Sequence, residues 1–123
     1  MTTQEIANRL IELIRAGDYA TAQKELYSND ITSIENPITP NSFMQYSKVT
    51  GMEALAEKGK KWEEGMEELF DQGASNPIVT ENAIAISIWF DAKMKGAPER
   101  SRMEEIGVYS IKDGKIVREE FVY

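Results

Sequence analysis

The chain has 123 residues, of which 41% are hydrophobic and 28% are charged, and this composition is typical of one soluble globular domain. Its net charge of −7, from 21 acidic and 14 basic residues, argues against a nucleic-acid partner, because phosphate binding needs clustered Lys and Arg. The sequence contains neither His nor Cys, which excludes imidazole bases, thiolate nucleophiles and zinc–thiolate sites.

No segment of the sequence has the character of a membrane span or a signal peptide. The longest nearly apolar run covers residues 83–90, whereas roughly 20 apolar residues are needed to cross a bilayer. The first five residues lack a basic start followed by an apolar stretch. We therefore expect no membrane partner and a cytoplasmic location. Glycine-rich phosphate loops are absent as well, and we expect no cofactor.

The first 26 residues predict two helices. Residues 3–16 carry apolar side chains at helical spacing, with a threonine at position 2 or 3 as N-cap and Gly17 as the terminator. Asp18 then caps a shorter helix, in which Tyr19, Ala22 and Leu26 share one face. The stripe of the first helix consists of Ile6, Leu10, Leu13 and Ile14.

The middle of the chain predicts a strand, a loop and a third helix. Residues 31–35 favour a short strand, which the following Asn-Pro pair ends, and residues 37–46 contain two prolines and predict a loop. Residues 51–66 return to helical spacing. The side chains that recur at steps of three and four are Met52, Leu55, Gly59, Trp62 and Met66.

The second half predicts five strands. They cover residues 67–75, 78–79, 83–95, 103–112 and 116–123. Because these strands follow one another without intervening helices, antiparallel pairing is favoured. The sequence therefore predicts an α+β domain, in which three helices pack on one face of a bent, mostly antiparallel sheet.

The strand that begins at residue 83 is apolar on both faces. Its even positions carry Ile84, Ile86, Ile88 and Phe90, and its odd positions carry Ala83, Ala85, Ser87 and Trp89. A strand buried on both sides needs a second covering layer. We predict that a second copy of the chain supplies this layer, which makes the protein a homodimer through the outer face of the sheet.

Five short segments together resemble one known family. They are Ala16-Gly-Asp-Tyr19, Leu26-Tyr-Ser-Asn-Asp30, Ser33-Ile-Glu-Asn-Pro37, Thr50-Gly-Met-Glu-Ala54 and Asp113-Gly-Lys-Ile116. In this order and spacing they resemble the nuclear transport factor 2-like superfamily, and within it the SnoaL-like (polyketide cyclase-like) group. The resemblance covers essentially the whole chain, residues 1–123, as a single domain.

The resemblance implies a cone-shaped α+β barrel with a pocket between the concave sheet and the helices, usually in a dimer. The superfamily includes isomerases, cyclases, epoxide hydrolases, dehydratases and members without known activity, so the chemistry must be argued from the site. Ketosteroid isomerases of this fold use an Asp where this chain has Asn36, a Tyr where it has Leu10, and an acid near Gly107. These departures argue against steroid isomerisation by that mechanism.

The Asp113-Gly114 turn sets which side chains of the last hairpin face inward. A three-residue turn with Gly114 in a bulge pairs Gly107 with Glu119 and Tyr109 with Val117. A two-residue turn slips the pairing by one residue and breaks up the inward set. In the three-residue arrangement, which the resemblance favours, the inward set is Glu105, Gly107, Tyr109, Val117, Glu119, Phe121 and Tyr123.

In that arrangement Glu105 and Glu119 are diagonal neighbours on the inner face. Two carboxyls in an apolar enclosure do not both ionise readily, so one holds a proton at neutral pH and the pair can serve as acid and base. Asn36 or Tyr109 would then polarise a ligand oxygen. The alternative is that the glutamates face water or form structural ion pairs, for which the candidate cations are Arg102, Arg118 and Lys93.

Large apolar side chains are the candidates for the lining of a ligand site. They are Trp62, Ile86, Ile88, Phe90, Phe121 and Tyr123, and plain core packing is the alternative for each. Phe43, Met44 and Tyr46 in the long loop would form a lid or a plug. The acidic cluster of Glu63, Glu64, Glu67, Glu68 and Asp71 lacks the spacing of a calcium loop, which favours a solvated face over a metal site.

Three functions remain open at this point. The chain is a cofactor-free isomerase, cyclase or hydrolase of a small hydrophobic molecule, with Glu105 and Glu119 as acid and base, or a non-catalytic protein that binds such a molecule. In the third alternative, the pocket is filled by the protein's own side chains and the dimer surface carries the function.

Overall fold

The computed structural model describes residues 1–41 and 44–123. In this part of the chain it contains three helices, α1 (Thr3–Arg15), α2 (Tyr19–Leu26) and α3 (Met52–Gly65). The strands are β1 (Tyr27–Asn36), β2 (Ser47–Thr50), β3 (Met66–Ala74), β4 (Ile78–Val79), β5 (Ala83–Met94), β6 (Ser101–Lys112) and β7 (Lys115–Val122). The predicted helices and the five strands of the second half are confirmed, with ends that differ by at most two residues.

Two elements of the first half differ from the prediction. β1 begins at Tyr27, four residues earlier than expected, because Tyr27 pairs with Ile116 of β7 before an irregularity that ends at Thr32. The polar residues 28–30 hide this extension in the sequence. β2 was not predicted at all, and its four residues pair with the end of β1. Such a short edge strand carries too little alternation to be recognised.

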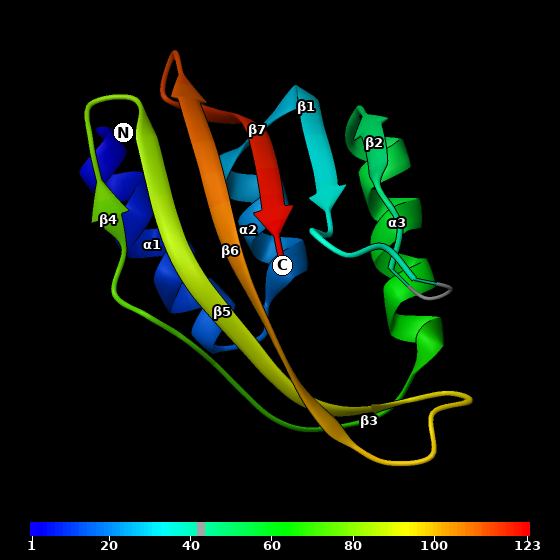
Figure 1. The fold of residues 1–123 in the computed structure, drawn as a ribbon. Helices are drawn as coiled ribbons and strands as arrows, with labels where there is room; N and C mark the ends of the chain where they lie inside the picture. Colours follow the sequence, from blue (N-terminus) through cyan, green and yellow to red (C-terminus); the bar gives the residue numbers. More distant parts are fainter. Residues whose placement is uncertain (42–43) are drawn as a thin grey trace.

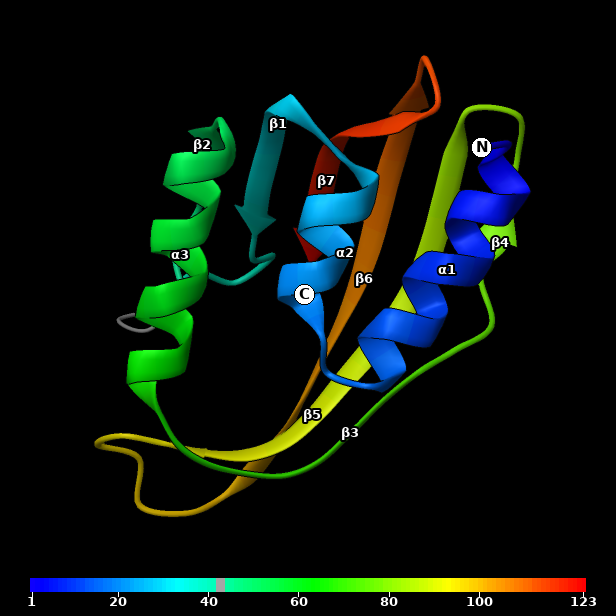
Figure 2. The same cartoon turned by 180° about the vertical axis from the view of Figure 1, so that it is seen from behind.

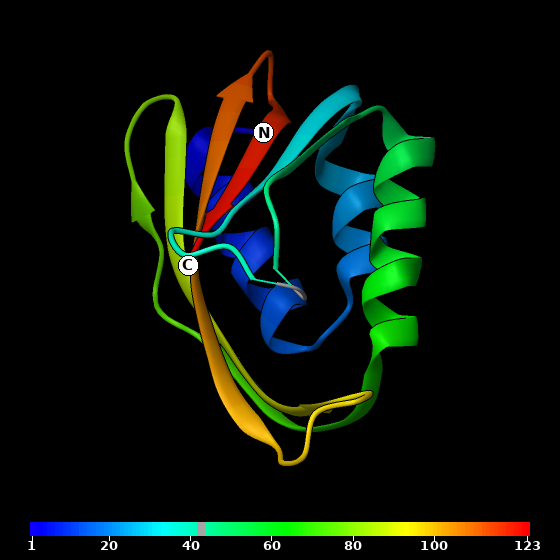
Figure 3. The same ribbon diagram turned by 45° about the vertical axis from the view of Figure 1, so that its right-hand side comes forward.

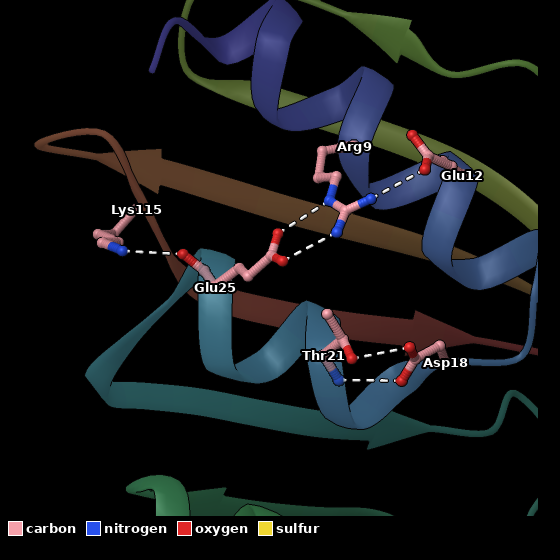
Figure 4. Close-up of polar contacts among 6 residues, drawn as sticks. All are labelled: Arg9, Glu12, Asp18, Thr21, Glu25 and Lys115. Atoms are coloured by element: carbon pink, nitrogen blue, oxygen red, sulfur yellow. Dashed lines mark hydrogen bonds and ion pairs between the residues drawn. The ribbon is translucent and has the colours of Figure 1, made fainter.

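The first two helices are fixed by their caps. Thr2 Oγ1 accepts a hydrogen bond from the Glu5 backbone N–H at 3.1 Å, and the Glu5 carboxylate accepts one from the Thr2 N–H at 2.9 Å. This reciprocal pair is a capping box, and it makes Thr2 the N-cap of the two threonines that the sequence offered. Gly17, with a φ of +72°, ends α1 in the left-handed region. Asp18 then accepts from the Thr21 N–H at 3.1 Å and starts α2 (Figure 4).

Surface ion pairs tie these two helices to each other, and a hydrogen bond ties α2 to the final hairpin (Figure 4). The guanidinium of Arg9 donates two hydrogen bonds to Glu25, both at 2.8 Å, and a third to Glu12 at 2.8 Å. Lys115 Nζ donates to the backbone oxygen of Glu25 at 2.9 Å. The bidentate geometry holds α2 in one orientation against α1.

The sheet has the strand order β2-β1-β7-β6-β5-β3, with β4 also paired to β5. All pairs are antiparallel except β1 with β7. α1 and α2 lie on one face of this sheet (Figures 1 and 2). The long strands β5 and β6 bend strongly, so that their far ends, together with β3, reach toward the end of α3 (Figure 3). The predicted α+β class, with helices on the concave face of a curved sheet, is confirmed.

β5 alternates as the sequence predicts. Its even positions are at most 8% exposed and belong to the core: Ile84, Ile86, Ile88 and Phe90. The apolar stripe of α1 packs against the same core through Ile6, Leu10, Leu13 and Ile14. On the opposite face of β5, Ser87 is exposed and Trp89 is half-buried. The inner face of the sheet therefore holds the core, and the outer face stays partly apolar and uncovered.

The predicted geometry of the final hairpin is wrong. The turn contains only Asp113 and Gly114, both at positive φ (52° and 71°), and Lys112 pairs with Lys115. This is the primed two-residue turn that an Asp-Gly pair favours. Beyond it, Ile111 pairs with Ile116 and Ser110 with Arg118, so Val117 is an extra residue on β7.

The bulge at Val117 restores the alternation that the two-residue turn would have broken. Tyr109 pairs with Glu119, and Gly107 pairs with Phe121. Both members of each pair face inward, as predicted, although their partners are not the predicted ones. Val117 is the exception in the inward set, because Ile116 takes its place in the core.

No helix in residues 1–41 or 44–123 is long and apolar enough to cross a membrane. The cytoplasmic location and the absence of a nucleic-acid partner stay predictions.

Candidate functional site

Glu119 is a charged residue within the core, only 4% exposed. Both of its carboxyl oxygens are engaged. The hydroxyl of Tyr27 donates a short hydrogen bond to one oxygen, and Ser33 Oγ donates to the other at 2.8 Å. Burial raises the pKa of Glu119, while these hydrogen bonds and the nearby ammonium of Lys58 oppose the increase. The strand pairing of β1 with β7 places Ser33 next to Glu119.

A half-buried ammonium group extends this network toward α3. Lys58 Nζ donates to Ser33 Oγ at 2.7 Å and to Glu35 at 2.8 Å, and it lies 5.5 Å from the ring centroid of Phe121. The hydroxyl of Tyr123 donates to the other oxygen of Glu35 at 3.3 Å. Lys58 therefore supplies the positive charge that accompanies Glu35 and Glu119 inside the fold.

Glu105 differs from Glu119 because its carboxyl forms no hydrogen bond or ion pair with any residue in the described ranges. It lies on β6 opposite Ile88, on the inner face of the sheet. Burial, with the charges of Glu35 and Glu119, raises the pKa of Glu105 from 4.5 to about 8, although Lys58 opposes the increase. The side chain is therefore mostly neutral at pH 7 and has a proton to donate.

Two tyrosine hydroxyls lie near this carboxyl. The Tyr19 hydroxyl, from the first residue of α2, is buried and has no hydrogen-bond partner among the described residues. Burial raises the pKa of Tyr19, and the charge of Glu105 adds to this effect. Tyr109 is 2% exposed, and burial and the charges of Glu119 and Glu105 raise its pKa well above the ordinary value. Both hydroxyls therefore stay protonated and can act as donors.

The predicted contact between the two glutamates is not formed. Glu119 pairs with Tyr109, and the Gly107–Phe121 pair separates this position from Glu105. The charge of Glu119 still contributes to the raised pKa of Glu105. The alternative ion pairs are not formed by these glutamates either, because the three candidate cations have other partners. Arg102 pairs with Glu104, Arg118 with Glu120, and Lys93 with Glu67.

Asn36 does not lie with the two carboxyls. Its side-chain amide donates to Glu120 at 3.1 Å, and Glu120 alternates with the inward Glu119 on β7. The strand alternation thus places Asn36 on the other face of the sheet, which removes it as a group that polarises a ligand oxygen. A short Asn-Pro segment in the sequence could not show which face the Asn takes.

Some of the predicted lining residues are packed in the core, and others are partly exposed. Ile86 and Ile88 are at most 2% exposed and are packed in the core. The ring of Phe121 lies 6.1 Å from that of Tyr109 at an angle of 87°, and Tyr123 is half-buried. Trp62 is 37% exposed, and its ring lies 5.7 Å from that of Phe90. Of the three residues predicted to form a lid or a plug, Phe43 lies outside the described residues, Met44 is half-buried and Tyr46 is 59% exposed.

A hollow of about 240 Å³ lies where the end of α3 meets β3, β5 and the start of α2. Trp62, Phe90 and Tyr19 form its aromatic walls, and we refer to it as the Trp62 hollow. The charge of Glu105 contributes to the raised pKa of Tyr19, so this carboxyl acts electrostatically on one wall of the hollow. A shallower depression of about 440 Å³ is lined by Thr50 and the first turns of α3 and touches neither carboxyl. In the described residues, no three acidic side chains converge as a metal site.

Sequence reasoning missed five polar residues of the interior: Tyr19 as a donor, Tyr27, Ser33, Glu35 and Lys58. Signals existed for three of them. Ser33 and Glu35 alternate on one side of a predicted strand, and Lys58 stands three residues after the buried Leu55 on α3. Tyr27 had no such signal, because it reaches Glu119 through a part of β1 that the pattern did not reveal.

Comparison with known proteins gives one family for the whole chain. The sequence pattern described as the SnoaL-like domain matches residues 1–123. The chain is similar to a solved protein from Mesorhizobium loti, described as a candidate SnoaL-like polyketide cyclase, with 32% identity, full coverage of both chains and a TM-score of 0.85. No curated protein sequence is similar enough to count as a match.

Two further solved structures share the fold at lower identity. A protein of unknown function with a cystatin-like fold from Xanthomonas campestris has 24% identity and a TM-score of 0.74, over 98% of this chain and 89% of that one. TerC, crystallised with polyporic acid, has 10% identity and a TM-score of 0.75, over 98% of this chain and 90% of that one. These similarities show the fold.

Proposed function

This chain belongs to the SnoaL-like domain family, and we propose that it binds a small, mostly apolar molecule between the concave sheet and the helices. We propose further that it acts on this molecule by acid–base chemistry, without a cofactor. One observation carries the second step: Glu105 is an inward carboxyl with no partner among the described residues, and its pKa is raised to about 8. A group that titrates near the working pH is suited to donate a proton and to take one back.

The residues around Glu105 would orient the ligand and support the site. The hydroxyls of Tyr19 and Tyr109 would orient a ligand oxygen, since both stay protonated, and that of Tyr19 has no partner among the described residues. Glu119 has both oxygens engaged by Tyr27 and Ser33. We therefore propose that Glu119 supports the site through these hydrogen bonds, whereas the acid–base pair predicted from the sequence assigns it proton transfer.

The relatives guide the choice of ligand. The Mesorhizobium loti protein is described as a candidate polyketide cyclase, and TerC was crystallised with polyporic acid. Compounds with oxygenated, conjugated rings are therefore the first to test, together with steroids and terpenoid epoxides. A thermal-shift screen would select those that raise the melting temperature of the protein, because a ligand that binds only the folded state stabilises it.

Acid–base chemistry can be tested once a ligand is found. For a ligand with an acidic C–H bond, the protein in deuterated water should catalyse exchange of that proton, which NMR measures directly. Glu105→Gln should bind the ligand and lose at least about a hundredfold in exchange rate. Glu104→Gln, on the neighbouring outward position, is the matched control and should keep the rate. Binding without exchange in the unmodified protein would identify a non-catalytic binding protein.

We also propose the homodimer predicted from the sequence. Ile106 is 51% exposed and Val108 is 38% exposed, and both alternate with inward residues of β6, so they belong to the outer face. This uncovered apolar surface supports a second copy as the missing layer. Sedimentation analysis should give a dimer, which Ile106→Glu should dissociate. A monomeric unmodified protein would contradict the proposal.

A further inference from the structure

We propose that the Trp62 hollow binds a small organic cation, such as a quaternary ammonium or protonated amine group. This inference deepens the proposed function by naming a ligand class. It rests on the proposed binding at this place, but not on catalysis. The hollow combines two features that recognise such cations. Its walls are the rings of Tyr19, Trp62 and Phe90, and its rim carries the carboxylates of Glu63, Glu67 and Glu68.

The aromatic walls come from three different elements. Trp62 lies in the last turn of α3, Phe90 on β5, and Tyr19 at the start of α2. The rings of Trp62 and Phe90 are tilted by 57° with centroids 5.7 Å apart, so they do not stack face to face. An aromatic face attracts a cation electrostatically, and several faces around one hollow favour a compact onium group.

Other aromatic rings of this protein already have a cation of their own. Arg102 lies 4.4 Å from the ring of Trp89, Arg100 lies 4.2 Å from that of Phe70, and Lys58 lies 5.5 Å from that of Phe121. Among the Trp and Phe rings of the described ranges, Trp62 and Phe90 alone have no such partner. Both belong to the lining of the hollow, where the ring of Trp62, 37% exposed, is open to an external cation and Phe90 lies behind it.

The charged groups around the hollow reinforce this preference. No Lys or Arg is among its lining residues. Glu67 has a partner in Lys93 at 2.9 Å, but Glu63 and Glu68 form no ion pair with any described residue. These carboxylates are exposed to solvent, so each adds only modestly to the attraction for a cation, and salt screens that attraction. The hollow therefore has a negative rim and apolar walls, and a volume of about 240 Å³ suits a small ligand.

The test uses a pair of probes that differ in charge but hardly in shape, choline and 3,3-dimethyl-1-butanol. Isothermal titration calorimetry or NMR titration should show that choline binds at least about tenfold more tightly than the neutral alcohol. Trp62→Leu should lower choline affinity about tenfold, whereas Trp89→Leu, which removes the other tryptophan, should leave it unchanged. Glu63→Gln with Glu68→Gln should weaken binding, and the same charge change at Glu53 and Glu57 should not.

A spectroscopic measurement on the unmodified protein tests the same site without depending on whether a variant folds. In the unmodified protein, choline should shift the indole N–H resonance of Trp62 and leave that of Trp89 in place. Equal or tighter binding of the neutral alcohol would overturn the cation preference while the proposed binding site stands. If neither probe binds but the apolar compounds of the thermal-shift screen do, the cation proposal fails alone. If nothing binds, the proposed function fails as well.

Discussion

Replacing Glu105 by glutamine should stabilise the folded protein progressively as the pH rises from about 4.5 to about 8. Glutamine resembles the protonated carboxyl in shape, but it never acquires a charge. The folded protein holds the Glu105 proton up to a pKa of about 8, whereas the unfolded chain releases it near the ordinary value of 4.5. Between these values the folded state binds more protons, so the free energy of unfolding falls with rising pH. In Glu105→Gln the free energy of unfolding does not fall for this reason, because the amide does not titrate.

The size of the effect follows from the two pKa values. One pKa unit corresponds to about 1.4 kcal/mol, so the difference between 4.5 and about 8 gives an upper limit of roughly 5 kcal/mol at alkaline pH. At pH 7 the same relation gives roughly 3 kcal/mol, and at pH 5 less than about 1 kcal/mol. Water that enters when the carboxylate forms would reduce these penalties, because Glu105 is not completely buried.

Urea unfolding of both proteins at pH 5, 6, 7 and 8 measures the difference. The free energies of unfolding should nearly coincide at pH 5, and the variant should be the more stable protein by about 2 to 4 kcal/mol at pH 8. Glu104→Gln is the control, because Glu104 is exposed and pairs with Arg102 at the surface. It should change stability by less than about 0.5 kcal/mol at each pH. Parallel curves for the unmodified protein and Glu105→Gln would refute a raised pKa at this site.

Three other substitutions test the interior. Ser33→Ala should lower the free energy of unfolding by about 1 to 3 kcal/mol in urea titrations, because Glu119 loses a hydrogen bond that it cannot replace with water. Lys58→Met should destabilise the fold more at pH 8 than at pH 5, since Glu105 and Glu119, whose pKa values are raised, ionise as the pH rises and Lys58 favours their charged forms; an equal loss at both would contradict its electrostatic role. Gly107→Ala should cost about 1 to 3 kcal/mol, because a Cβ there meets the Tyr109 ring at 3.0 Å; an unchanged melting temperature would show that the ring moves freely.

The helices could be predicted because each has a local cause. The stripe and cap of α1 lie within consecutive residues, and a local pattern of this kind needs no knowledge of the rest of the fold. The hairpin was different. Its turn residues indicated a turn, but the number of residues in that turn and the bulge at Val117 depend on how β7 fits between β6 and β1. The error in the turn and the unforeseen bulge cancelled, which is why Glu119 faces inward as predicted.

The polar network around Glu119 could not be predicted from the sequence for a related reason. Glu119 contacts Tyr27 at the start of β1 and Ser33 in its second half, and Lys58, 61 residues earlier in the chain, hydrogen-bonds to the same Ser33 from α3. Nothing local to the hairpin indicates these partners. The sequence could show that carboxyls alternate toward a concave face, but it could not distinguish the anchored Glu119 from the unpaired Glu105. That distinction is a property of three-dimensional packing, and it changes which of the two is the better acid.

The contrast between the two carboxyls also bears on whether the interior is built for folding alone. Glu119 is held by two hydrogen bonds and a nearby ammonium, so its burial is largely compensated. Glu105 has no such compensation among the described residues, and above its unfolded pKa it reduces stability. An apolar side chain facing Ile88 would remove this penalty without leaving a buried charge. The contacts of Glu119 therefore account for its burial, whereas no contact accounts for the burial of Glu105. Proton exchange with a ligand would explain why a carboxyl stands at this position, and the exchange experiment can refute that explanation.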